Sequence, residues 1–181
     1  IGGRSVRPPL PPGVAELGYA NSVKWEESQG PARYRRGLYI HFQRTTPYPQ
    51  LISFDAPDSN VACSRRSRSN TALQSLNLLN DPVFFEAAQA FALRILDRAG
   101  EGFTNRIRYA FETALGRPPS PTEAERLGKY LDQQLSILRG DPKQVVALMP
   151  VPPEGIAPEE AAAWVGISRV LLNTDEFITR E

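Results

Sequence analysis

Prolines divide this sequence into short segments. Seventeen of the 181 residues are proline, and most fall in four clusters, at residues 8–12, 47–49, 118–121 and 150–158. Proline has no backbone N–H and clashes with the preceding turn of a helix, so regular elements must lie between these clusters. At this length we expect one domain with a trailing extension, built from short elements and proline-rich connections.

Composition excludes several kinds of chemistry. Lysine and arginine total 21 and aspartate and glutamate total 20, so the net charge of +1 gives no overall reason to expect a nucleic-acid partner. No apolar run approaches the ~18 residues of a membrane span, so the chain is not expected to cross a membrane. Cys63 and His41 are the only residues of their kinds, which removes internal disulfides, attached haem, cysteine zinc sites and catalytic triads from consideration.

The first third of the sequence has weak and mixed signals. Residues 1–31 are rich in proline and glycine and predict an extended arm, with a short strand near 22–26. Residues 32–44 carry apolar positions at both helical and strand spacing, and the helical interpretation is favoured. Residues 45–69 predict a long ordered loop. The opening IGGRSVRPPLPPG is typical of the interior of a longer protein, so we expect the chain to be a fragment or a processed piece.

Strong helix signals begin at residue 70. NDP at 80–82 and DP at 141–142 each place a capping side chain before a proline that suits the first helical position. SPTE at 120–123 is a capping box. The positions predicted to be buried recur at helical spacing: Phe84, Phe85, Ala88, Phe91, Ala92, Ile95, Leu96, Ile107, Phe111, Leu127, Leu131, Leu135 and Leu138.

Together these signals predict a mostly α protein, an irregular helical bundle with a Pro-rich extended N-terminal arm and a long ordered loop. The expected organisation is an arm over 1–31 and a helical domain over 32–181. Within that domain we expect core helices over 70–149 and a C-terminal helix over 158–173.

Several longer motifs occur in a fixed order. They are YRRGLY, RTTP, FDAP, SRRSRSNTALQSL and LLNDP, followed by AFETALGRPPSPTE and the closing WVGISRVLLNTDEFITRE. In this pattern the chain resembles the C-terminal domain of unknown function numbered fifteen-fifty-three, which is found mainly in planctomycetes and verrucomicrobia. Gly37, Ala72 and Ser75 depart from the family pattern, which usually has Ser, Pro and Ala there.

The resemblance implies a setting rather than a reaction. Family members usually end large exported proteins, often with a c-type cytochrome domain upstream. It therefore implies the periplasm or cell envelope as the location and upstream domains or a partner protein as the contact. No cofactor is expected in this chain, and haem c would sit on an upstream or partner domain. No catalytic residues can be carried over from the family.

One charged cluster is the candidate site. It combines the arginines of the 64–71 stretch with the carboxylates of FDAPD, and its members are Arg65, Arg66, Arg68, Asp55, Asp58 and Asn70. Guanidinium groups near a helix start favour a carboxylate, sulfate or phosphate ligand. Equally, arginines and amides can hold a proline-rich loop by bonding its carbonyl groups, and the length of the loop favours this structural interpretation.

The sequence is compatible with three functions. The first is an interaction or scaffold module, and the second is part of an envelope or polysaccharide-directed enzyme whose Arg/Asp-lined cleft an upstream domain completes. The third is a haem-free docking module for a c-type cytochrome, in which His41 would be either a packing residue or an axial ligand to a neighbouring haem. Cys63 is expected to be inert. Whether the chain is an enzyme is not decided, because no catalytic set is evident.

Overall fold

The computed structural model describes residues 3–10, 25–43, 47–57 and 59–179. The chain divides into two compact units, residues 1–83 (the N-terminal unit) and residues 84–181 (the C-terminal unit). The sequence placed a boundary near residue 31 instead. The helix that follows the loop therefore belongs to the first unit and not to the core bundle.

The N-terminal unit is built from short elements. It contains the 3-10 helices η3 (Gly30–Tyr34) and η4 (Gly37–Tyr39) and the α-helices α1 (Pro49–Ser53) and α2 (Ala72–Asn80). α1 and α2 contact each other. The loop predicted over 45–69 thus contains a short helix, because Pro49 fits the first position of a helix. Residues 59–71 then run without regular structure and are exposed to solvent.

The helix favoured over 32–44 is wrong. Val6 N–H donates to the carbonyl of Tyr39 and His41 N–H donates to the carbonyl of Val6, both at 2.8 Å. These two bonds make a parallel bridge between Val6 and Ile40. Pairing with a distant segment therefore takes the backbone groups that a helix would have used, and only the two 3-10 turns remain.

Carbonyl groups of the proline-rich arm are bonded by aromatic side chains. The indole N–H of Trp25 donates to Pro8 O at 2.7 Å, and the Tyr48 hydroxyl donates to Pro9 O at 3.2 Å. The two rings stack with their centroids 6.0 Å apart. The strand predicted near 22–26 falls largely outside the described residues, and Trp25 itself is not in a strand.

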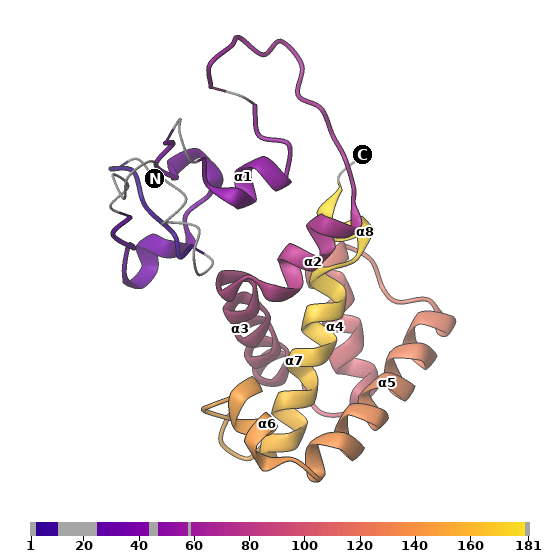
Figure 1. Cartoon of the computed structure of the whole chain (residues 1–181). Coiled ribbons are helices and arrows are strands. Elements are labelled where there is room, and N and C mark those ends of the chain that lie inside the picture. Colours follow the sequence, from indigo (N-terminus) through magenta and orange to yellow (C-terminus); the bar gives the residue numbers. More distant parts are fainter. Residues whose placement is uncertain (1–2, 11–24, 44–46, 58, 180–181) are drawn as a thin grey trace. The chain divides into compact units, whose positions relative to one another are not determined.

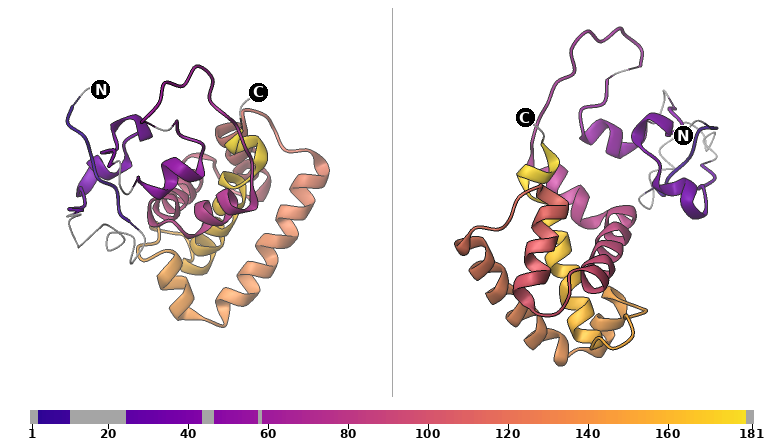
Figure 2. Two further views of the ribbon diagram at one scale, coloured as in Figure 1. Left: turned by 45° about the horizontal axis from the view of Figure 1, so that its top comes forward. Right: turned by 180° about the vertical axis from the view of Figure 1, so that it is seen from behind.

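The C-terminal unit is a helical bundle around one apolar core. Its helices are α3 (Pro82–Arg98), which begins at the boundary, then α4 (Phe103–Leu115), α5 (Pro121–Arg139), α6 (Pro142–Leu148), α7 (Pro158–Leu172) and α8 (Asp175–Ile178). α7 runs through the middle of the unit and contacts α4, α5, α6 and α8 (Figures 1 and 2). The mostly α fold predicted from the sequence is confirmed.

α7 is buried along most of its length. Its buried residues are Ala161, Ala162, Ala163, Trp164, Val165, Ile167, Ser168 and Leu171. At Gly166 the helix passes close to α5, where an added Cβ would lie 3.0 Å from the hydroxyl oxygen of Tyr130. Small side chains on α7 therefore let the surrounding helices approach closely.

The predicted helix starts in this unit are confirmed. Ser120 and Glu123 form the capping box of α5, and Asp141 accepts from the backbone N–H groups of Lys143 and Gln144 at the start of α6. These caps satisfy backbone donors that have no partner inside the helix.

Candidate functional site

The predicted Arg/Asp cluster forms the base of the exposed loop in the N-terminal unit. The carboxylate of Asp55 accepts two hydrogen bonds from Ser69, from its backbone N–H and its hydroxyl, each at 2.7 Å. Asp55 has a φ of 55°, in the left-handed region that aspartate tolerates better than most residues. The hydrogen bonds from Ser69 lower the pKa of Asp55, and Arg66 adds to this effect. The carboxylate is therefore kept ionised and is a poor general acid.

Arg66 bonds main-chain carbonyls. Its Nε donates to Asp55 O at 2.9 Å, and its terminal nitrogen donates to Phe54 O. Arg65 and Arg68 lie on the same exposed stretch as Arg66, as does Asn70. Asp58 lies outside the described residues.

His41 and Cys63 take no part in the hydrogen bonds around Asp55. The His41 ring is partly buried, with its centroid 6.4 Å from that of Trp25. Cys63 is exposed, and its thiol donates to the carbonyl of Arg65 at 3.3 Å.

Gln74 links the loop to both helices of the N-terminal unit. Its side-chain oxygen accepts from Thr71 N–H at 2.9 Å, and its amide nitrogen donates to Ser53 O at 2.8 Å and to Ser69 Oγ at 3.0 Å. One turn later, Asn77 donates to Ser53 Oγ at 2.6 Å. The sequence interpretation missed Gln74, although a glutamine three residues after Thr71 is a capping-box signal.

Asp81 ties α1 to the start of α3. Gln50 donates to one carboxylate oxygen at 2.9 Å, and Val83 N–H donates to the other at 2.8 Å. Asp81 is buried. The carboxylate therefore caps the next helix, as the NDP pattern predicts, and also binds a side chain 31 residues earlier.

The exposed side of α2 carries two leucines. Leu73 is 62% exposed and Leu76 is 54% exposed, whereas Gln74 between them is buried. On neighbouring α1, Ile52 is 60% exposed. In α2, therefore, Gln74 is buried while Leu73 and Leu76 are exposed, and the other two leucines, Leu78 and Leu79, are half-buried.

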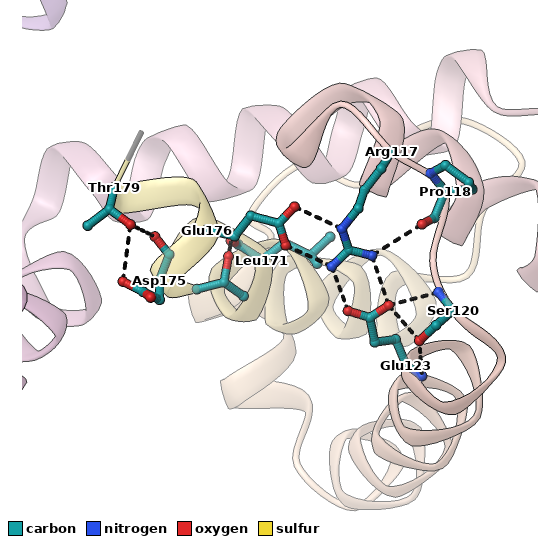
Figure 3. Close-up of polar contacts among 9 residues, drawn as sticks. Arg117, Pro118, Ser120, Glu123, Leu171, Asp175, Glu176 and Thr179 are labelled. Atoms are coloured by element: carbon teal, nitrogen blue, oxygen red, sulfur yellow. Dashed lines mark hydrogen bonds and ion pairs between the residues drawn. The ribbon is translucent and has the colours of Figure 1, made fainter. Parts of the chain in front are cut away.

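A second charged cluster lies in the C-terminal unit (Figure 3). Arg117 donates to both carboxylate oxygens of Glu123, at 2.7 and 3.0 Å, and to both of Glu176, at 2.8 and 2.7 Å. Glu123 also accepts from the backbone N–H and the hydroxyl of Ser120, each at 2.7 Å. Arg117 therefore fastens α8 to the start of α5.

The charges of this cluster stabilise one another. Hydrogen bonds from Arg117 and Ser120 lower the pKa of Glu123 to about 2, and Arg117 also lowers the pKa of Glu176. The two carboxylates in turn raise the pKa of the Arg117 guanidinium. Neither glutamate is suited to donate a proton near neutral pH.

A cavity of about 860 Å³ adjoins this cluster, between the end of α4 and α8. Its lining residues are Glu112, Thr113, Ala114, Leu115, Gly116, Asp175, Glu176, Phe177 and Thr179. Glu112 pairs with Arg108 at 2.8 Å, and Asp175 accepts from the Thr179 hydroxyl at 3.2 Å. Among the described residues, no group of three His, Cys, Asp or Glu side chains is placed to hold a metal ion.

Comparison with known families places the chain in one of them. The family model described as "PSD1: Protein of unknown function (DUF1553)" matches residues 1–131. The chain belongs to this DUF1553 family. No curated protein and no solved structure matches its sequence. The family resemblance seen in the sequence motifs is therefore confirmed.

The DUF1553 match covers the two charged clusters unequally. Asp55, Arg66 and Gln74 all lie within residues 1–131, whereas the α8 half of the Arg117 cluster lies beyond them.

In the described part of this DUF1553 chain, no helix is long and apolar enough to span a membrane.

Proposed function

We propose that this chain is an interaction module, which binds another domain of its parent protein or a partner protein through α1 and α2. One observation carries the proposal. On α2, the amides of Gln74 and Asn77 bond inward to α1 and the loop, while Leu73 and Leu76 face solvent. Exposed leucines a turn apart on one helix are typical of a surface that another protein covers.

The charged residues of the N-terminal unit support this function over catalysis. Arg66 holds two main-chain carbonyls and Asp55 holds Ser69, so both side chains stabilise the loop. A catalytic carboxylate is usually poised near the working pH, whereas the hydrogen bonds to Asp55 lower its pKa. The charged side chains therefore hold the loop next to α1 and α2, and they have a structural role.

We also propose that the module works in the periplasm or cell envelope, as part of an exported multidomain protein. Any haem c would then belong to an upstream or partner domain. The support for this setting is the family resemblance. Fractionation of cells that produce the intact parent protein tests it, because a protein recovered with the cytoplasm would contradict an exported location.

Photo-crosslinking in the intact parent protein, in its own cells, tests the interaction function. A photoreactive phenylalanine is placed at Leu73 or Leu76 in separate variants. Matched controls carry it at Val146 or Val151, which are 61% and 77% exposed in the C-terminal unit. We expect cross-links from the two α2 positions to another domain of the parent or to a second protein, and few from the controls.

Two results would overturn the proposal. One is a yield of cross-links at Leu73 and Leu76 no higher than at the two valines. The other is cross-linking of the α2 positions only to residues 84–181 of the same chain, which would make the leucines part of an internal contact.

A further inference from the structure

The two units differ in charge. Residues 1–83 contain ten lysines and arginines and six aspartates and glutamates, whereas residues 84–181 contain eleven and fourteen. The near-neutral net charge of the chain is therefore the sum of a basic N-terminal unit and an acidic C-terminal unit. The exposed leucines of α2 belong to the basic unit, so a partner with acidic residues is attracted to them over distances of about 10 Å.

Part of this positive charge shortly precedes the leucines along the chain. The exposed stretch 59–71 carries Arg65, Arg66 and Arg68 and ends at Thr71, the N-cap of α2. Figure 2 shows this stretch as the long connection that leads into α2. Arg66 bonds carbonyl groups at the base of the loop, and Arg65 and Arg68 are exposed on the same stretch.

The apolar part of the surface has a defined spacing. Leu73 and Leu76 lie three residues apart on α2 and so share one side of the helix. Ile52 is exposed on α1, which contacts α2. Apolar side chains on two neighbouring helices, with guanidinium groups on the stretch that leads into one of them, match an amphipathic helix that has acidic residues beside its apolar stripe.

We propose that this surface binds an acidic amphipathic helix of the partner, with apolar residues at i, i+3 or i+4 and aspartate or glutamate beside them. The inference rests on the proposed interaction function and adds the chemistry of the partner segment. A nucleic acid would use the arginines but leave the leucines in water, so a protein segment accounts for more of the surface.

Selection from a random peptide library tests the inference. Peptides of about 20 residues are displayed and selected on the full chain, and a parallel selection uses the Leu73→Ser/Leu76→Ser variant. We expect enriched peptides to be net negative and to carry apolar residues at helical spacing. Enrichment of basic or unpatterned peptides, equal enrichment on the variant, or no enrichment would each overturn it.

Affinity measurements with one enriched peptide complete the test. We expect Kd to weaken about tenfold or more in Leu73→Ser/Leu76→Ser, and about threefold or more in Arg65→Ser/Arg68→Ser with a reduced dependence on salt. The control Val146→Ser/Val151→Ser keeps the parent Kd. Equal weakening in all three variants would contradict the proposed surface. If cross-linking succeeds in cells but the selected peptides are not acidic, the interaction function stands and the inferred partner chemistry is wrong.

Discussion

The two units of this chain are stabilised in different ways. The C-terminal unit buries a continuous set of apolar side chains from α3 to α7, with Trp164, Phe111 and Ile95 among the largest. In the described residues of the N-terminal unit, the buried apolar side chains are those of Val6, Pro8, Pro9 and Tyr48. That unit relies instead on hydrogen bonds from side chains to loop backbone.

This difference has a thermodynamic consequence. Burial of a large apolar side chain contributes roughly 1.5–3 kcal/mol, while a typical internal hydrogen bond contributes about 1 kcal/mol net. A unit with few buried apolar side chains is therefore expected to be modest in stability. Its remaining apolar surface, on α1 and α2, is available to a partner, and binding there would add the stability that the unit's own core does not supply.

The largest expected effect is loss of the core of the C-terminal unit. Trp164→Ala removes a side chain that is 1% exposed at the centre of α7. We expect the free energy of unfolding to fall by about 3–5 kcal/mol. Chemical denaturation followed by circular dichroism measures it. The matched control is Val151→Ala, at an exposed position. If the free energy of unfolding changed by a similar small amount in both variants, the C-terminal unit would not depend on its apolar core.

In the N-terminal unit, the comparable change is the loss of a buried amide. Gln74→Ala leaves the carbonyl of Ser53 and the N–H of Thr71 without their partner. We expect a loss of about 1–3 kcal/mol, confined to this unit. Hydrogen exchange of residues 49–80 should accelerate while that of α7 stays unchanged. Gln133→Ala, on the exposed side of α5, serves as the control, and slow exchange in the Gln74 variant would show that the amide is dispensable.

The Arg117 cluster adds a pH-dependent contribution to the C-terminal unit. Glu123 has a pKa of about 2 when folded, below its ordinary value of 4.5. Its contribution is therefore present above pH 4.5 and is lost as the pH falls towards 2. We expect urea unfolding to show wild type more stable than Arg117→Ala at pH 6, with the difference shrinking steadily between pH 4.5 and 2. A difference that is constant with pH would contradict the ion-pair assignment.

A smaller loss is expected at the loop base. Arg66→Ala releases the carbonyls of Phe54 and Asp55 at an exposed position, where water replaces the lost bonds. We expect a loss of about 0.5–1.5 kcal/mol and faster hydrogen exchange around Ser69, measured against Arg65→Ala. An Arg66 variant with the melting temperature and exchange rates of the Arg65 variant would show that the loop does not depend on this guanidinium.

Local patterns in the sequence predict the C-terminal unit well. The SPTE capping box and the leucine spacing of α5 act within one helix, so neighbouring residues determine them. The sequence also predicts that arginines could bond loop carbonyls, as Arg66 does. The Glu176 partner of Arg117 was missed, because it lies 59 residues away and no local pattern connects the two.

In the N-terminal unit, local sequence patterns do not predict the structure fully. The leucines of α2 predict a helix but do not say which side is buried, and here the amide side packs inward. Residues 32–44 read as a helix from their spacing, yet Tyr39 and His41 bond Val6 more than 30 residues earlier. In both cases long-range contacts decide the structure, because they outweigh local preference when a segment is short.

The smallest expected effect provides the most direct test of the account. Leu73 and Leu76 are surface residues of a unit that is stabilised by hydrogen bonds. Denaturant unfolding of Leu73→Ser/Leu76→Ser in the full chain should therefore lie within about 0.5 kcal/mol of wild type. A loss of about 2 kcal/mol or more would show that the leucines belong to a core, and it would contradict the difference between the two units.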